Sequence, residues 1–234
     1  MITLRQGRWQ DVLKETSCDA LISDPPYGAR THEGQTYECE RKNNDAHVSE
    51  QGLGYDALTP EQVHELVEHW EPRTRGWMCF FTSHDLVPVY TEALQAKRYV
   101  FAPIACVQRG MNVRLAGDGP ANWTTWLVVA RGRSLKNWGA LPGAYTGSTG
   151  RDKAFERVPG SKPLWLMRAV IRDYSRHSDV ICDPYAGAGT TLLAARAEGR
   201  HAVGAEMDQQ RYELAQRNLF PQSNTLSLFG EEAP

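Results

Sequence analysis

The chain lacks any long uninterrupted hydrophobic run. No apolar stretch among its 234 residues approaches the roughly 18 residues that a membrane-spanning helix needs. The segment Met1 to Trp9 also lacks the basic stretch followed by an apolar stretch that marks a secretory leader. A membrane-spanning protein is therefore excluded by pattern, and we expect a cytoplasmic one.

Cysteines in paired spacing are missing as well. The five cysteines are an odd number and none of them form a Cys-x-x-Cys motif. Such usage indicates neither a disulfide framework nor a zinc site, so we expect no metal.

A strong excess of one charge is also absent, because the formal net charge is -2. The charge is uneven, however: between Arg109 and Lys162 there are nine basic and three acidic residues, which gives +6 there and -8 elsewhere. Local positive potential can draw in a phosphate backbone whatever the total charge. A solvated, arginine-rich loop would give the same count, and composition alone leaves both interpretations open.

Length and a hydrophobic content of 41% favour a single domain over residues 1–234 with one substantial core. Short runs of β-branched, aromatic and other apolar residues predict seven strands: Ile2 to Leu4, Asp19 to Ser23, Trp77 to Phe81, Val100 to Val107, Trp123 to Ala130, Asp179 to Cys182 and Ala202 to Ala205. Apolar residues at helical spacing predict helices from Thr59 to Trp70, His84 to Lys97, Pro163 to Arg176, Thr190 to Glu198 and Asp208 to Leu219. The alternation predicts an α/β fold with a doubly wound, mostly parallel sheet.

Two insertions and a tail interrupt this alternation. Residues 30–58 form a long polar segment, and residues 132–161 are basic and glycine-rich with Trp138, Tyr145 and Phe155 among them. Cations mixed with aromatic rings suit nucleic-acid backbone contact and base stacking, so the second insertion is a candidate DNA-reading segment. The alternative is a pair of ordinary surface loops whose aromatic rings pack against the fold. Residues 220–234 form a C-terminal tail.

A glycine-containing loop follows the strand that ends near Cys182. It runs Asp183-Pro184-Tyr185-Ala186-Gly187-Ala188-Gly189 and leads into Thr190-Thr191 at the start of a helix. Glycines let a ligand approach the backbone, and open α/β sheets bind ligands at such strand ends. The next strand ends in Glu206, whose carboxylate can accept hydrogen bonds from two ribose hydroxyls. The pattern favours a nucleoside site over a tight structural turn.

The tetrad Asp24-Pro25-Pro26-Tyr27 follows an earlier strand directly. The amine of a nucleobase is a poor nucleophile because its lone pair is conjugated into the ring, and acceptors around it can return electron density to nitrogen. The Asp24 carboxylate and the Pro25 carbonyl are such acceptors, Pro26 stiffens the turn, and Tyr27 offers a face for stacking. The alternative is a proline-rich turn with a helix-capping aspartate. The presence of the glycine loop in the same chain favours the catalytic interpretation over this alternative.

Together these motifs resemble the S-adenosylmethionine-dependent amino-methyltransferases that modify DNA at adenine N6 or cytosine N4, in the permuted β-class whose tetrad precedes the cofactor loop. The pair Lys162-Pro163, which opens a helix, and the residues Gly204, Glu206, Tyr212 and Ala215 are similar to further family motifs. The chain departs from the family where Gly7 is followed by Arg8 and Trp9 rather than by an acid.

The resemblance implies a seven-stranded, Rossmann-like methyltransferase fold and methyl transfer to a base flipped out of DNA. It implies cofactor contacts from the glycine loop, the acid after it and the Lys-Pro pair, and base contacts from the tetrad. The cofactor residues would be Asp183, Tyr185, Gly187, Gly189, Thr190, Thr191, Glu206, Lys162 and Pro163, and the catalytic residues Asp24, Pro25, Pro26 and Tyr27. A tetrad led by aspartate favours adenine N6, with cytosine N4 as the alternative.

The motif order and the tetrad disfavour the related enzymes that act on protein glutamine or on ribosomal RNA guanine. A catalytically silent DNA- or cofactor-binding subunit of a methyltransferase complex stays open. Members of the permuted group are often dimers, so a homodimer is expected. The segment Thr225 to Phe229 is similar to the short motif by which bacterial enzymes dock on the replication sliding clamp, although a tail that packs back on its own sheet would look the same.

Overall fold

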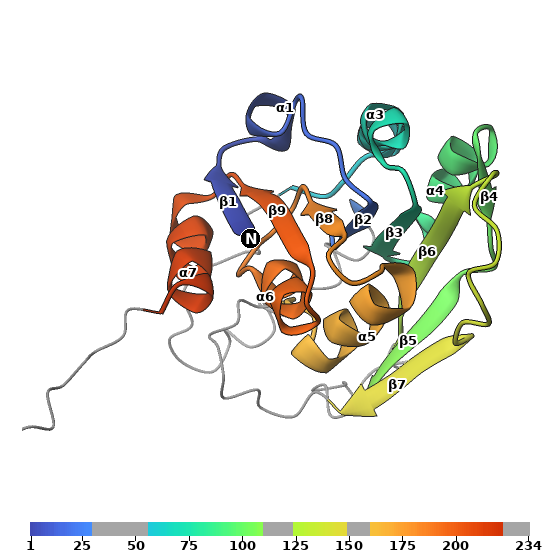
Figure 1. Cartoon of the computed structure of the whole chain (residues 1–234). Coiled ribbons are helices and arrows are strands. Elements are labelled where there is room, and N and C mark those ends of the chain that lie inside the picture. Colours follow the sequence, from blue (N-terminus) through green and yellow to red (C-terminus); the bar gives the residue numbers. More distant parts are fainter. Residues whose placement is uncertain (30–55, 110–123, 149–159, 222–234) are drawn as a thin grey trace, which may run out of the picture.

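The protein folds around one central β-sheet, shown in Figure 1. The computed structural model describes residues 1–29, 56–109, 124–148 and 160–221. Its nine strands are β1 (Ile2–Gln6), β2 (Ala20–Ser23), β3 (Trp77–Thr82), β4 (Arg98–Val100), β5 (Ile104–Arg109), β6 (Thr124–Gly132), β7 (Ala144–Ser148), β8 (Val180–Asp183) and β9 (His201–Glu206).

The sheet is mostly parallel, and its strand order is β1-β9-β8-β2-β3-β6-β5-β7 with β4 also paired to β6. Strand β6 is antiparallel to β3, β4 and β5, whereas the other pairs are parallel. The doubly wound, mostly parallel sheet is therefore confirmed.

The strand number differs from the expected seven. The predicted strand Val100 to Val107 is two strands, β4 and β5, separated by residues 101–103. Pro103 lies in that gap and has no N–H to donate to a ladder, which is a physical reason for the break. Strand β7 lies inside the second insertion, where small and polar residues in Ala-Tyr-Thr-Gly-Ser gave no alternating hydrophobic signal.

The helices are α1 (Trp9–Val12), α3 (Pro60–Trp70), α4 (Val87–Gln95), α5 (Leu164–Tyr174), α6 (Thr190–Ala197) and α7 (Gln209–Leu219), with a 3-10 turn at Glu71–Arg73. Five of them match predicted helices, and α1 was not predicted. At the start of α3, Thr59 Oγ1 accepts from the Gln62 backbone and the Gln62 side chain accepts from the Thr59 backbone. This reciprocal capping box is the one that the sequence indicates.

Two hydrophobic cores cover the two faces of the sheet. One is formed with residues of α5, α6 and α7, and the other with residues of α1, α3 and α4. Strand β3 contributes to both by alternation, with Cys79 and Phe81 in the first core and Met78 and Phe80 in the second. Figure 1 shows α1 and α3 on one side of the sheet and α5 and α6 on the other. Both faces are therefore covered, and in open α/β sheets of this kind ligands bind at the carboxyl ends of the strands.

The insertions and the tail are described in part. Residues 30–55 and 149–159 and the tail beyond residue 221 lie outside the described residues, and with them Phe155 and Thr225 to Phe229. Among the described helices, none is long and apolar enough to span a bilayer. The described parts of the chain also hold no cluster of three or more residues suited to a metal ion.

Two aromatic rings of the second insertion pack into the fold. Trp138 meets Trp77 edge to face at 5.9 Å between ring centroids, and its Nε1 donates to the Asp173 carbonyl at 2.7 Å. Tyr145 is buried, and its hydroxyl donates to Asp173 Oδ2 at 2.7 Å. For these two rings the interpretation as ordinary loop aromatics fits better than base stacking.

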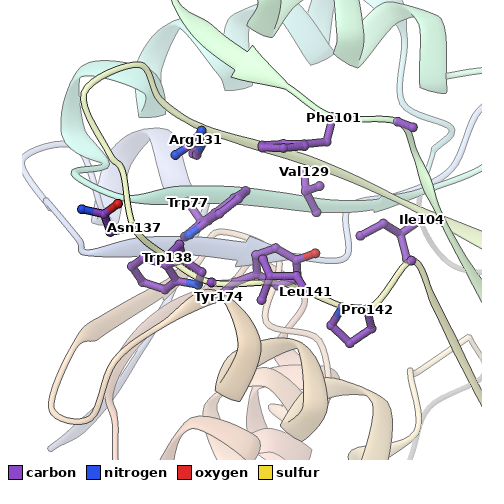
Figure 2. Close-up of a pocket in the computed structure, with 13 residues that line it drawn as sticks. Trp77, Phe101, Ile104, Val129, Arg131, Asn137, Trp138, Leu141, Pro142 and Tyr174 are labelled. Carbon is purple, nitrogen blue, oxygen red and sulfur yellow. The ribbon is translucent and has the colours of Figure 1, made fainter.

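Trp138 also forms a wall of a cavity of about 480 Å³ (Figure 2), together with Trp77, Phe101 and Leu141. The cavity lies beside the first residue of β3 and the last residue of α5, Tyr174. The tetrad follows the last residue of β2, which is parallel to β3. The cavity and the tetrad therefore lie at opposite ends of these parallel strands.

Candidate active site

The tetrad and the glycine loop meet at one edge of the sheet. Strands β2 and β8 are parallel neighbours, with Leu21 opposite Cys182, so the residues that follow each strand emerge side by side. The last residue of β2, Ser23, donates from Oγ to Asp183 Oδ1 at 2.6 Å. Two motifs separated by more than half of the chain are thereby joined by a direct hydrogen bond.

Asp24 is held by a lysine from a distant segment. Lys162 Nζ donates to Asp24 Oδ2 at 2.7 Å, and the lysine side chain is only 5% exposed. The other oxygen, Asp24 Oδ1, is buried and has no hydrogen-bond partner among the described residues. Burial raises the pKa of Asp24, and the ammonium of Lys162 opposes that shift.

Lys162 also lies against aromatic rings, and its charge is maintained there. Its Nζ is 4.9 Å from the centroid of the Tyr27 ring and 5.6 Å from that of Phe81. Burial by itself would lower the pKa of Lys162, but the neighbouring Asp24 carboxylate raises the pKa above its ordinary value. Lys162 therefore keeps its positive charge beside Asp24.

The backbone of the tetrad is fixed to β3 and to the start of α3. Gly28 N donates to Ser83 Oγ at 3.2 Å, directly after β3. Leu58 N donates to the Tyr27 carbonyl at 3.0 Å, directly before the cap of α3. A Cβ at Gly28 would come within 2.2 Å of Asp85 Oδ2, so a larger residue there would require the Asp85 side chain to shift.

The glycine loop uses its two glycines differently. Gly187 has φ +52°, and a Cβ placed there would meet no atom of the described residues within 4 Å. Gly189 has φ +84° at the cap of α6, and a Cβ there would lie 3.3 Å from Ala215 and Leu219. The left-handed backbone favours glycine at both positions. Gly187 faces open space, whereas Gly189 closes against α7.

Glu206 ends β9 beside this loop and is 7% exposed. Its Oε2 accepts from Gly187 N and its Oε1 accepts from Asp208 N, each at 2.9 Å. Burial raises the pKa of Glu206, and these two backbone N–H groups oppose that shift. Because a carboxylate offers about four acceptor positions, two remain for ribose hydroxyls. The oriented carboxylate and the open space over Gly187 fit a nucleoside cofactor.

The remaining predicted cofactor residues surround the same edge. Thr190 and Thr191 are buried in the first turn of α6, and Pro163 is the N-cap residue of α5. The Tyr185 hydroxyl accepts from Trp9 Nε1 at 3.1 Å, so the chain places Trp9 of α1 beside the loop.

Sequence reasoning missed three of these connections. Ser23 and Trp9 were not singled out, and Lys162 was expected over the cofactor rather than on the tetrad. The final position of a buried strand was a usable signal for Ser23. No local pattern could have indicated a contact between Lys162 and a residue 138 positions away.

A parallel α/β sheet with a glycine loop and an acid at adjoining strand ends defines the Rossmann-like class of nucleoside-binding folds. Within that class, the chain belongs to the DNA methylase family of N6 and N4 amino-methyltransferases, whose family model matches residues 41–217. The methyltransferases of this family use S-adenosylmethionine as methyl donor.

The chain is similar to several characterised relatives over short stretches. It is 35% identical over 98 residues to the Type II methyltransferase M.HindIII of Haemophilus influenzae, covering 39% of this chain and 31% of the relative. It is 34% identical over 65 residues to the DNA adenine methyltransferase YhdJ of Escherichia coli, covering 28% of this chain and 22% of the relative. The matched stretches thus span about a third or less of these relatives.

The fold is shared over nearly the whole chain with a solved structure, the complex of M1.HpyAVI with S-adenosylmethionine. The TM-score is 0.69 at 21% identity, covering 94% of this chain and 100% of the other. The Rossmann-like methyltransferase fold that the sequence predicts is therefore confirmed.

Proposed function

We propose that the protein transfers a methyl group from S-adenosylmethionine to the exocyclic N6 amine of adenine in DNA, after the base has been flipped out of the duplex. The observation that carries this proposal is the contact between the two motifs through Ser23 and Asp183 at one sheet edge. A base amine held by the tetrad and a cofactor held by the loop would then share one site.

The cofactor residues of this proposal are the glycine loop, Glu206 and the first turn of α6. Glu206 would hold the ribose, and Gly187 would let the nucleoside approach the backbone. When bound, S-adenosylmethionine would supply the methyl group of its sulfonium: the S–CH3 bond breaks as the N–CH3 bond forms, a neutral thioether is left, and the methylated nitrogen releases one proton to solvent.

The tetrad residues would prepare the amine. Asp24 Oδ1 has no other hydrogen-bond partner in the described structure and would accept one amine hydrogen, while the Pro25 carbonyl would accept the other. Two acceptors favour a pyramidal nitrogen whose lone pair points at the methyl group. Tyr27 would offer its ring face for stacking with the base.

Adenine is the favoured base for two reasons. The tetrad begins with aspartate, and YhdJ, a relative at 34% identity, is a DNA adenine methyltransferase. Cytosine N4 is the second candidate, because the family model covers both N6 and N4 enzymes. A catalytically silent subunit is the third, although tetrad, glycine loop and Glu206 are all present.

Product analysis separates these candidates. The protein is incubated with labelled S-adenosylmethionine and mixed-sequence DNA, and the DNA is digested to nucleosides. We expect labelled N6-methyldeoxyadenosine. Labelled N4-methyldeoxycytidine would instead identify cytosine as the substrate. The absence of both products would favour a catalytically silent subunit.

Replacement of Asp24 tests the role of the tetrad. We expect Asp24→Ala to lower methyl transfer by about 100-fold or more, since an acceptor aimed at the reacting group is lost. Binding of S-adenosylmethionine, measured by calorimetry, should persist. Asp11→Ala on α1, an exposed position, is the matched control and should keep full activity. Retained activity in Asp24→Ala would remove Asp24 from the mechanism.

We also propose two partners: a second copy of the chain and the replication sliding clamp. A homodimer would appear as twice the chain mass in sedimentation. Docking of Thr225 to Phe229 on the sliding clamp would appear as capture of the full chain, but not of a chain ending at Asn224, by immobilised clamp. Equal capture of both, or of neither, would remove the docking motif.

A further inference from the structure

Lys162 makes its shortest contact with the tetrad rather than with the glycine loop. Its Nζ is 2.7 Å from Asp24 Oδ2 and 3.4 Å from the Gly160 carbonyl, and the rings of Tyr27 and Phe81 cover it. A buried ammonium must be paired, because removal from water is costly for an isolated charge. The carboxylate of Asp24 is the charged group that pairs with it.

This pairing makes the two oxygens of Asp24 unequal. Oδ2 is occupied by the ammonium, whereas Oδ1 is buried and has no partner in the described part of the chain. A carboxylate without such an anchor could turn about its terminal torsion and present either oxygen. With Oδ2 fixed, only one oxygen is left to face a substrate.

We propose that Lys162 is a positioning residue for the reaction: its ammonium anchors Asp24 Oδ2 so that the ionised Oδ1 receives a hydrogen of the target amine. This inference rests on the proposed function and assigns to Lys162 a role on the base side of the site. Lys162 acts through Asp24 and needs no contact with the reacting atoms.

The positive charge of Lys162 also favours the ionised form of Asp24. Among the residues that the structure describes, the titratable groups that face Asp24 from other elements are Lys162, Tyr90 of α4, Asp183 of β8 and Cys106 of β5, with Tyr27 from the tetrad itself. Lys162 is the only cation in this set. Burial raises the pKa of Asp24 and Lys162 lowers it, so loss of the ammonium should leave Asp24 protonated to a higher pH.

The first test uses the protein without cofactor or DNA. The carboxyl carbon of Asp24 is followed by NMR against pH in the wild type, in Lys162→Gln and in Lys136→Gln. Lys136 is exposed, so its replacement removes the same charge at a remote place. We expect the Asp24 midpoint to rise in Lys162→Gln and to stay unchanged in Lys136→Gln. An unchanged midpoint in both variants would overturn the proposal.

The second test is kinetic. We expect Lys162→Gln to lower kcat by about 100-fold at neutral pH, the scale for loss of one preorganised contact, while KM for DNA and the dissociation constant for S-adenosylmethionine stay unchanged. The acid limb of its pH profile should move to higher pH. A loss confined to cofactor affinity would instead make Lys162 a cofactor residue and overturn the proposal.

Lys162→Arg keeps the test decisive if the glutamine variant does not fold. Arginine retains the charge but has a different shape, so we expect the wild-type acid limb with a reduced kcat. An acid limb shifted as in a neutral variant would contradict the proposal. A wild-type protein that methylates no base would refute the proposed function alone, because the NMR titration does not depend on activity.

Discussion

Asp183 links the chemistry of the site to the stability of the fold. Its Oδ1 accepts from Ser23 Oγ at 2.6 Å and from Tyr185 N at 3.0 Å, and the side chain is 1% exposed. Burial raises the pKa of Asp183 from 3.8 to about 6, although these hydrogen bonds oppose the shift. The protein therefore maintains a costly carboxylate at the junction of the two motifs.

The pH dependence of stability should reveal this cost. The pKa of Asp183 is higher in the folded state than in the unfolded state, so the folded state holds the proton more tightly. Asp183 therefore lowers the free energy of unfolding of the protein by up to about 3 kcal/mol as pH rises from 3.8 to about 6. Asp183→Asn keeps the Oδ1 acceptor and cannot ionise. Relative to wild type, its free energy of unfolding should rise through this window and stay level above it.

Urea denaturation over the pH range measures this difference. The control is Asp11→Asn, at an exposed position on α1, which should show no such slope. A difference between Asp183→Asn and wild type that does not change with pH would contradict the assignment of the raised pKa to Asp183.

At the scale of elements, the loop between β8 and α6 separates binding from stability. Gly187 leaves open space over the backbone next to Glu206, while Gly189 lies against Ala215 and Leu219 of α7. Both positions have left-handed backbone, so alanine at either costs about 1 kcal/mol from strain. Only at Gly189 does a methyl group also press on the core.

The two alanine variants should therefore behave differently. We expect Gly187→Ala to weaken binding of S-adenosylmethionine by about tenfold or more, because the new methyl group occupies the approach of the ligand to the loop. We expect Gly189→Ala to lower the melting temperature further than Gly187→Ala does. Calorimetric titration and thermal unfolding measure these effects. Equal affinity in Gly187→Ala and wild type would place the nucleoside elsewhere.

Elements also differ in how well the sequence predicted them. Helix α3 was predicted from Thr59 and Gln62 because a capping box is a local contact. Strand β7 was missed, since Ala144–Ser148 forms a strand only by pairing with β5. Helix α1 was missed because it spans four residues, too few for a helical period to show.

At the scale of the whole molecule, the site exists because strand order differs from chain order. Strand β2 lies between β8 and β3, so the first and last thirds of the chain share one sheet edge. Each face of the sheet has its own core, and the site lies at the strand ends between them. Ligand binding should therefore stabilise the fold as a unit.

Thermal unfolding with S-adenosylmethionine tests this coupling. At a ligand concentration 100 times the dissociation constant, binding adds about 2.7 kcal/mol, which shifts the melting temperature of a chain of this size by about 5 to 10 °C. Asp24→Ala should show the same shift, because Asp24 is assigned to the base. No shift in the wild type at saturating ligand would contradict a cofactor site on this sheet edge.

The sequence by itself determined most of the helices and strands and the chemical types of the site. Alternating strands and helices, the glycine loop, Glu206 and the tetrad were all readable, because each depends on residues near one another in the chain. Tertiary structure alone decided which of them meet. The Ser23–Asp183 hydrogen bond and the Lys162–Asp24 pair join residues 160 and 138 positions apart. Such contacts follow from strand order and packing, which no local periodicity encodes.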